Sequence, residues 1–213
     1  MPFNFQKFLV LAPHTDDGEF GCGGTIARLL EAGTEGHYIS FSICEESVPY
    51  GYPQDILQTE LIAATNVLGF KRENVHSLRY PVRKFNYYRQ EILEDIIRLR
   101  NSIKPDLVFI PSLNDLHQDH KVIAEEGVRA FKNSSLLSYE LLWNIISFHN
   151  TCFFELTLNQ VEKKIKAIQE YKSQTFRGYS DPDFIKAQLK VRGVQVGLEY
   201  AEVFEVVRIF SKL

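Results

Sequence analysis

Residues 8–24 of the chain read FLVLAPHTDDGEFGCGG. The first five of these residues form an uninterrupted apolar run of strand length, which is typical of a strand covered on both faces. Polar residues and glycines follow at once, and the next apolar residues, Ile26, Leu29 and Leu30, have helical spacing up to Gly33. This order predicts a buried parallel strand, a polar loop and then a helix.

The same alternation recurs along the first half of the chain. We expect strands at 8–12, 37–43, 75–80 and 106–110, and helices at 25–32, 53–68 and 89–103. Four strand-then-helix units in a row predict an α/β fold with a doubly wound, Rossmann-like, mostly parallel sheet and helices on both faces.

The pattern changes beyond residue 120 and predicts a smaller C-terminal β/α extension. The expected elements are a helix at 120–131, extended segments at 140–148 and 152–156, a helix at 161–171 and a strand at 203–210. The tract 173–183 is rich in Ser, Gly, Pro and Asp, and we interpret it as a loop and a candidate mobile flap.

Composition favours an ordinary globular chain. It has 213 residues, of which 45% are hydrophobic and 24% charged, so we expect residues 1–213 to form a single domain. A net charge of -3 gives no concentrated excess of Lys and Arg for nucleic acid or an anionic membrane. The apolar run at 8–13 is too short for a membrane span, and the three cysteines form no C-x-x-C pair. We therefore predict a cytoplasmic protein, and association into a homo-oligomer stays open.

Polar clusters follow the first and the fourth expected strand, at 13–24 and at 116–120. In a parallel α/β sheet, ligands bind beyond the carboxyl ends of the strands, where these two clusters lie. Between them they contain three of the six histidines and several carboxylates. Zinc accepts imidazole and carboxylate ligands, and a catalytic zinc site keeps three protein ligands and one open position. The clusters therefore predict a metal site with two histidines and one carboxylate.

Each feature also has a structural interpretation. Either Asp16 or Asp17 alone is typical of a helix cap, and His117 with His120 is compatible with two rings on one helical turn. The run G-C-G-G at 21–24 resembles a phosphate-binding turn only weakly, since it lacks the dinucleotide spacing and the phosphate-loop lysine. We interpret these glycines as room for backbone close to metal and substrate.

Residues 12–26 (APHTDDGEFGCGGTI) resemble the opening motif of the LmbE-like, or PIG-L, zinc-dependent de-N-acetylases, which reads A-H-P-D-D-E with G-C-G-G-T following. The tetrapeptide HQDH at 117–120 resembles their second motif, H-x-D-H, and the segments 166–174 and 192–204 resemble their late helix and tail. The resemblance spans nearly the whole chain. It implies a hydrolase that removes the acetyl group from an N-acetylated amino sugar or its conjugate, of the N-acetylglucosamine type.

The resemblance also implies a role for six positions. His14, Asp17 and His120 match the metal ligands, with Zn²⁺ as the implied ion and Fe²⁺ as an alternative. Asp16 matches the general base that activates water. His117 matches the residue that stabilises the oxyanion and protonates the leaving amine, and Asp119 matches the carboxylate that orients and charges this histidine.

Departures from the family motif occur at three positions. Pro13 precedes the histidine, Thr15 stands where the family has proline, and Gly18 stands where it has glutamate after the two aspartates. The glutamate is expected to support the loop, and Glu19 is the candidate replacement. Whether Gly18 weakens activity stays open.

Substrate contacts and competing functions are less well defined by the sequence. Arg83 and Glu46 are candidate substrate-binding residues, although a salt bridge of Arg83 with Glu91 or Glu94 is at least an equal expectation, and solvent exposure of the pair Glu45 and Glu46 is the default interpretation. The expected partner is a small-molecule N-acetyl sugar. The competing functions are a non-catalytic nucleotide-sugar-binding module that uses residues 21–25, and a metal-dependent phosphoester hydrolase.

Overall fold

The computed structural model describes residues 5–211 of the chain. Its strands are β1 (Lys7–Ala12), β2 (Glu35–Ser40), β3 (Val75–Ser77), β4 (Leu107–Pro111), β5 (Ser135–Tyr139), β6 (Cys152–Glu155) and β7 (Ala201–Arg208). Its α-helices are α1 (Asp17–Glu31), α2 (Ile56–Leu68), α3 (Arg89–Ile103), α4 (Gln118–Ala130), α5 (Leu158–Gln169) and α6 (Pro182–Val194).

The strands form one seven-stranded sheet in the order β3-β2-β1-β4-β5-β7-β6. The first five pair in parallel, whereas β7 runs antiparallel to both of its neighbours. The central strands β1 and β4 are buried almost throughout, as expected for strands with helices on both faces. The predicted doubly wound, mostly parallel sheet is confirmed.

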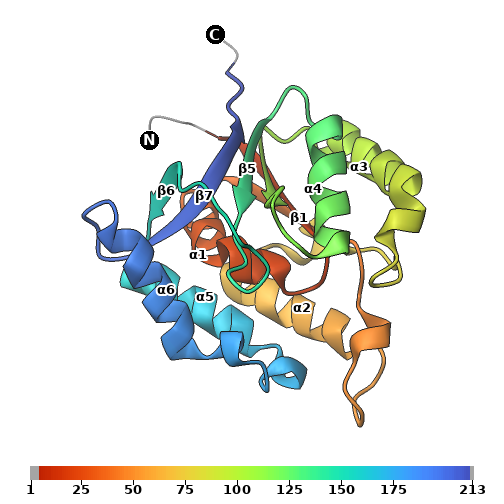
Figure 1. Cartoon of the computed structure of the whole chain (residues 1–213), viewed down its shortest axis with the longest axis horizontal. Coiled ribbons are helices and arrows are strands. Elements are labelled where there is room, and N and C mark those ends of the chain that lie inside the picture. The colour runs from red at the N-terminus through yellow and green to blue at the C-terminus, as the bar shows by residue number, and fades with distance from the viewer. Residues whose placement is uncertain (1–4, 212–213) are drawn as a thin grey trace.

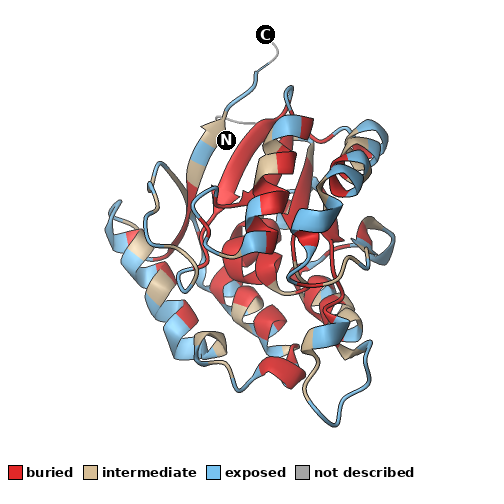
Figure 2. Cartoon of the chain, turned by 45° about the vertical axis from the view of Figure 1, so that its right-hand side comes forward, coloured by how far each residue is buried: buried red, intermediate tan, exposed pale blue. Residues whose placement is uncertain are grey.

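Helices cover the sheet on both sides, as Figures 1 and 2 show. One apolar core contains residues of α1, α2, α5 and α6, and α5 packs against both α1 and α2. The second core lies on the other face and contains residues of α3 and α4. The apolar side chains of α3 follow a helical period, for example Ile92 and Ile96, so one stripe of this helix is buried.

Three elements differ from the sequence-based expectation. The strand expected at 140–148 is wrong, since β5 precedes it and residues 140–150 form a loop apart from one isolated bridge at Ile145. Several apolar side chains of that segment, those of Leu142, Trp143 and Ile146, are exposed in this loop rather than buried in a strand. Helix α6 was not expected, although Asp181 and Pro182 form a standard helix start. Helix α1 begins at Asp17, well before the expected position, and contains a kink at Cys22.

Residues 173–181 form a loop with short 3-10 turns at Lys172–Gln174 and Gly178–Ser180, and the last two residues of the expected loop, Pro182 and Asp183, begin α6 instead. Its amino end is anchored, because the backbone N–H and the hydroxyl of Ser173 both donate to the carboxylate of Glu60 in α2. Mobility of the rest of this tract stays a prediction. Within residues 5–211, none of the helices has the length and apolar character needed to span a membrane.

Candidate metal centre and active site

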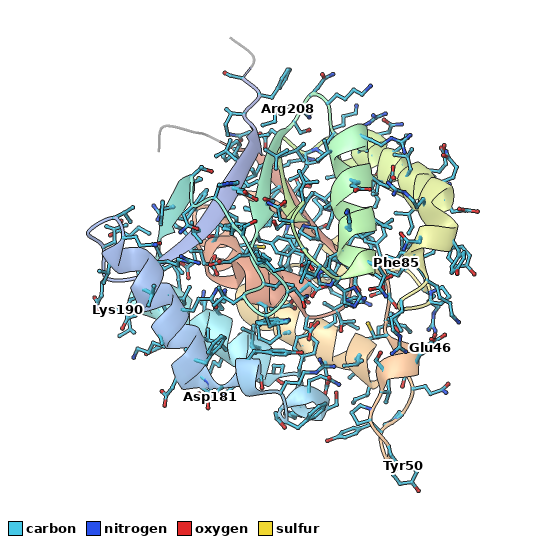
Figure 3. The ribbon with its side chains drawn as sticks, viewed as in Figure 1. Glu46, Tyr50, Phe85, Asp181, Lys190 and Arg208 are labelled. Carbon is cyan, nitrogen blue, oxygen red and sulfur yellow. The ribbon has the colours of Figure 1, made fainter. Side chains whose placement is uncertain are left out.

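The loops that follow β1 and β4 meet at one end of the sheet. The two strands are parallel neighbours, so their carboxyl ends lie side by side. His14 lies in the first loop, Asp17 begins α1, and His120 lies in the first turn of α4. Figure 3 labels Phe85 and Glu46 towards this end of the molecule and Arg208 at the opposite end.

Three donor atoms from these loops form a compact triangle. His14 Nδ1 lies 3.1 Å from His120 Nε2, and Asp17 Oδ2 lies 3.3 Å from each of these nitrogens. Asp17 and His120 are buried and His14 is partly buried. Tetrahedral ligands at zinc distances of about 2.0–2.2 Å are separated by roughly 3.3 Å, so the triangle has the size that a shared zinc ion requires.

Electrostatics also suit a cation at this triangle. Burial acts to raise the pKa of Asp17, but the neighbouring rings of His120 and His14 hold it well below its usual range. The carboxylate is therefore ionised and available as a ligand. Ring nitrogens of His14, His117 and His120 also lie within 4.8 Å of one another, so the ring of His117 adjoins the triangle.

Each of the two triangle histidines is held by a carboxylate outside the triangle. Asp115 Oδ2 lies 2.8 Å from His120 Nδ1, and Asp119 Oδ2 lies 3.1 Å from His14 Nε2. A carboxylate can only accept, so each of these ring nitrogens donates to its carboxylate and the other nitrogen of each ring faces the triangle. The same Asp115 also accepts from the backbone N–H of His117, through Oδ1 at 2.8 Å. The structure thus turns one nitrogen of each imidazole towards the triangle, as binding of a metal ion there would require.

Asp119 makes a different contact from the one we expected. Its carboxylate binds His14 and the backbone N–H groups of Arg83 and Phe85. Only its backbone N–H reaches His117, which accepts through Nδ1 at 3.2 Å. The expectation that the Asp119 carboxylate orients His117 is therefore corrected: this carboxylate supports a candidate metal ligand and the loop that carries Arg83.

The contact with Asp119 also decides the state of His117. A backbone N–H can only donate, so Nδ1 must keep its lone pair and the neutral ring carries its proton on Nε2. Burial and the nearby rings of His120 and His14 lower the pKa of His117 to about 4. The expected protonated His117 is thus replaced by a neutral imidazole that donates from Nε2.

Asp16 lies beside the triangle and is partly exposed. It occupies the residue before α1, yet its side chain makes no capping hydrogen bond, so the interpretation of Asp16 as a helix cap is wrong. Burial and the adjacent charge of Asp17 raise the pKa of Asp16 to about 6. A carboxylate in this range can accept a proton near neutral pH and release it again.

A cavity of about 270 Å³ opens over these groups. His14, Asp16, Asp17, His117 and His120 all line it, so the structure brings five of the six predicted chemical residues to one surface. The sixth, Asp119, lies behind His14. A larger cavity of about 1030 Å³ lies at the other end of the sheet and contains none of these residues.

Of the two candidate substrate residues, Arg83 lines this cavity and Glu46 does not. Arg83 has a positive φ of 65°, a conformation that costs a non-glycine residue roughly 1–2 kcal/mol. The bond from its N–H to Asp119 holds it there. Its guanidinium lies 3.9 Å from Glu46, and no ion pair joins it to Glu91 or Glu94. Substrate binding by Arg83 and Glu46 stays a prediction.

The glycine run at 21–24 serves packing, so our interpretation of it as room near the metal is wrong. A Cβ on Gly21 would come within 2.2 Å of the Tyr139 ring, and one on Gly24 within 2.5 Å of Leu156. The backbone N–H groups of Gly24 and Thr25 donate to the buried carboxylate of Glu202, at 2.9 and 2.6 Å. These groups are therefore unavailable to a nucleotide phosphate.

Glu19 supports the loop after β1 through two buried tyrosines. Its carboxyl oxygens lie 2.6 and 3.0 Å from the hydroxyls of Tyr38 and Tyr171, which both contact the Thr15 carbonyl. Burial raises the pKa of Glu19 to about 8, so it is protonated at neutral pH and supplies a further donor to this cluster. A Cβ on Gly18 would come within 2.5 Å of the Tyr38 ring. Gly18 therefore leaves room for Tyr38, and Glu19 provides the support.

The sequence interpretation missed two kinds of residue at this site. Asp115 was overlooked, although a carboxylate five residues before a candidate histidine ligand, in the loop after a strand, was a usable signal. Arg177, Tyr179 and Trp143 also line the cavity. They come from distant segments, and no spacing in the sequence linked them to the metal motifs.

The chain is similar in sequence to known proteins. The family model described as GlcNAc-PI de-N-acetylase matches residues 9–131, more than half of the chain. A diacetylchitobiose deacetylase from Thermococcus kodakarensis is 25% identical over 197 residues, which cover 81% of this chain and 72% of the relative.

Solved structures share the fold over almost the whole chain. The N,N'-diacetylchitobiose deacetylase from Pyrococcus horikoshii has a TM-score of 0.80 and 22% identity, with 96% of this chain and 84% of that chain covered. GalB from Pseudomonas putida KT2440, a 4-carboxy-2-hydroxymuconate hydratase, has a TM-score of 0.76 and 18% identity, with 98% and 99% covered. The family match, together with the fold, shows that the chain belongs to the GlcNAc-PI de-N-acetylase, or PIG-L, family.

Proposed function

We propose that the chain is a metal-dependent hydrolase that removes the acetyl group from an N-acetylated amino sugar or its conjugate. The observation that carries this proposal is the donor triangle of His14, Asp17 and His120 beside a carboxyl group with a raised pKa, inside a cavity. Membership of a de-N-acetylase family and a diacetylchitobiose deacetylase as a relative support the choice of substrate.

The ion that we propose for this triangle is Zn²⁺, with Fe²⁺ as the alternative. Two imidazoles and one carboxylate at this spacing suit zinc, and such a set leaves a coordination position open. When bound, the ion lowers the pKa of water and polarises a carbonyl oxygen. Asp115 and Asp119 fix the two rings in the tautomers that this binding needs.

We assign the general base to Asp16. Its carboxylate takes one proton from water as the water oxygen forms a bond with the amide carbon. The nearby positive charges of His14 and, to a smaller extent, Arg177 counteract burial, and the resulting pKa of about 6 keeps most of Asp16 ionised at neutral pH. When the carbon–nitrogen bond breaks, the same proton passes from Asp16 to the amine nitrogen. The products are acetate and the free amino sugar.

We assign stabilisation of the developing oxyanion to His117. The bond from the Asp119 N–H to Nδ1 leaves the Nε2 proton directed away from that backbone, in a ring that lines the cavity. A neutral imidazole can donate this hydrogen bond to negative charge on the carbonyl oxygen. One donor of this kind contributes about 100- to 1000-fold in rate. Protonation of the amine by His117, as the resemblance implies, is not needed.

The direct test uses the purified chain. We expect about one equivalent of zinc by elemental analysis, and release of acetate together with one free amine from N-acetylglucosamine, N,N'-diacetylchitobiose or another N-acetylglucosamine conjugate. A chelator should abolish acetate release, and added Zn²⁺ or Fe²⁺ should restore it; the ion that restores the higher rate identifies the better cofactor. A chain that binds metal but releases no acetate from any of these compounds would contradict the proposal.

The competing functions are separated by the same preparation. GalB shows that this fold also occurs in a hydratase, so addition of water to an unsaturated acid without acetate release would indicate that chemistry. Hydrolysis of a phosphoester would favour the phosphoester alternative. Within residues 5–211 the one group of side chains found close enough together for an ion is that of His14, His117 and His120, at the same place as the triangle, whereas many phosphoester hydrolases use two ions.

A further inference from the structure

We infer that the amino sugar accepted by this site carries an anionic group, which the guanidinium of Arg177 binds with help from Arg83. The inference rests on the proposed function and narrows its substrate class to acidic N-acetyl amino sugars. Neither residue belongs to the metal triangle. They reach the same cavity from two separate loops, one after β3 and one between α5 and α6.

The side chain of Arg177 is held in place by neutral groups. Its Nε donates to the side-chain oxygen of Gln174 at 2.7 Å, and its Nη1 donates to the hydroxyl of Tyr179. The guanidinium also lies over the rings of Phe176 and Tyr179, with Cζ at 5.5 and 5.7 Å from the ring centroids. Gln174 is buried, so this support is built into the fold.

Hydrogen-bonding capacity of Arg177 remains unused. A guanidinium has five N–H donors, and among the described residues only two of them have partners. No carboxylate of residues 5–211 lies within 4.0 Å of its nitrogens as an ion pair, and the Nη2 group makes no hydrogen bond. A half-buried arginine that is fixed by neutral groups and faces a cavity is suited to a carboxylate or phosphate of a ligand.

Arg83 adds a second positive charge at the same cavity with little neutralisation. Its guanidinium makes no hydrogen bond with the described residues, and its contact with Glu46 is 3.9 Å long between two well exposed groups. Such an exposed pair contributes little and is easily replaced. The strained backbone of Arg83, held by Asp119, keeps this charge beside the metal triangle.

The size of the cavity limits the ligand. Its volume of about 270 Å³ lies just below the range of roughly 300–1,000 Å³ for sites that enclose drug-sized ligands. We therefore expect one amino sugar unit with a small acidic substituent. A phosphate and a carboxylate can each accept two parallel N–H bonds from one arginine. Both kinds of acidic group therefore belong in the test.

A second role for Arg177 must be separated from this one. Its charge also acts on Asp16 and lowers the pKa of that carboxyl group. If this were its only role, loss of Arg177 would slow all substrates equally. Binding of an anionic substituent instead predicts a loss that depends on the substituent.

The first experiment compares substrates on the zinc-loaded enzyme. Acetate release is measured with N-acetylglucosamine, its 1-phosphate and 6-phosphate, and N-acetylmuramic acid as the carboxylate compound. We expect kcat/KM for at least one acidic sugar to exceed that for N-acetylglucosamine by about 10- to 100-fold, as expected for a charge-assisted hydrogen bond. Arg177→Gln should remove most of this preference, mainly through KM, and Arg177→Lys should keep part of it.

The matched control is Lys172→Gln, which removes one positive charge from the same loop at a well exposed side chain. It should keep the preference. Equal loss on acidic and neutral sugars in Arg177→Gln, or no preference in the unmodified enzyme, would overturn the inference while leaving the deacetylase proposal intact. Failure to release acetate from any sugar would instead contradict the proposed function.

The second experiment measures binding without turnover. In an Asp16→Asn background Arg177 has no carboxylate to tune, so calorimetry of the preferred acidic sugar reports on direct contact. Adding Arg177→Gln to Asp16→Asn should weaken binding by about 10- to 100-fold, and the difference should shrink at high ionic strength. Unchanged affinity in a folded double variant would overturn the inference.

Discussion

Two buried polar clusters contact different parts of α1. They differ in whether their polar atoms are all hydrogen-bonded or remain available to a ligand. At the start of the helix, His14, Asp17 and His120 direct donor atoms at one another and at a cavity. Behind the kink, Glu202 accepts from two backbone N–H groups and from Lys164 Nζ at 2.7 Å, with every oxygen bonded. A buried polar group is available for chemistry only where its neighbours leave a donor or acceptor unused.

Removal of a triangle ligand should have the largest effect. We expect His120→Ala to lose the metal and to reduce acetate release by at least about 1000-fold, because the triangle keeps only two of its three ligands. The measurement is bound zinc together with kcat/KM. His149→Ala is the matched control, since the side chain of His149 is exposed and, within the part of the chain that the structure describes, pairs with Glu205 alone. Retention of stoichiometric zinc with full activity would remove His120 from the site.

Asp16→Asn should separate catalysis from metal binding. Loss of the general base is expected to lower kcat by roughly 100- to 10,000-fold, while zinc content stays near that of the unmodified chain. The exposed Asp55, which also precedes a helix without capping it, provides the control Asp55→Asn. Full activity of Asp16→Asn would exclude Asp16 as the base.

Glu202→Gln tests the other cluster, where we expect an effect on stability. It leaves the buried Lys164 without its ion pair, and breaking such a pair costs about 3–5 kcal/mol. For a chain of this length that corresponds to a fall in Tm of roughly 6–20 °C. Below the transition, zinc content should be unchanged. Glu199→Gln, at an exposed and loosely paired carboxylate, is the control. A large loss of zinc affinity with unchanged Tm would reverse our assignment of the two clusters.

The smallest effects should come from the carboxylates behind the ligand rings. We expect Asp115→Asn and Asp119→Asn each to weaken zinc affinity by about 10- to 100-fold, as measured by competition with a chelator. Only Asp119→Asn should also raise KM, because Asp119 alone holds the N–H of Arg83. Equal KM values for the two variants would show that this link does not position the Arg83 loop.

Local pattern predicted the first half of the fold well. Helix α3 has the expected bounds, and β1, β2 and β4 lie within a few residues of theirs. Their periodicity is strong because they are buried on both faces or along one clear stripe. The short strand β5 was not predicted, because we placed the extended segment in the apolar residues that follow it. α6 was missed because its apolar residues do not follow one clear stripe, and its start signal at Asp181 was not weighed.

The proximity of the three donor residues was predictable from sequence because parallel strands bring their carboxyl ends together, whatever the loops between them contain. His14, Asp17 and His120 could thus be placed near one another from two short motifs. The hydrogen-bond partners of these three residues could not be predicted from the motifs. Whether the Asp119 carboxylate faces His14 or His117 depends on contacts with residues distant in sequence, since it also accepts from the backbone N–H groups of Arg83 and Phe85.

By itself, the sequence determined the class of fold, the edge of the sheet that holds the chemistry and the family, since apolar period and motif order are local properties. Only the tertiary structure decided that the Tyr139 ring packs against Gly21 and that Glu202 accepts a hydrogen bond from the Gly24 N–H. The same holds for the room that Gly18 leaves for Tyr38 and for the position of Arg177 at the cavity. Such contacts join segments more than a hundred residues apart, or depend on which face of a strand meets which helix. Close packing and the pairing of every buried polar group fix them only once the whole chain has folded.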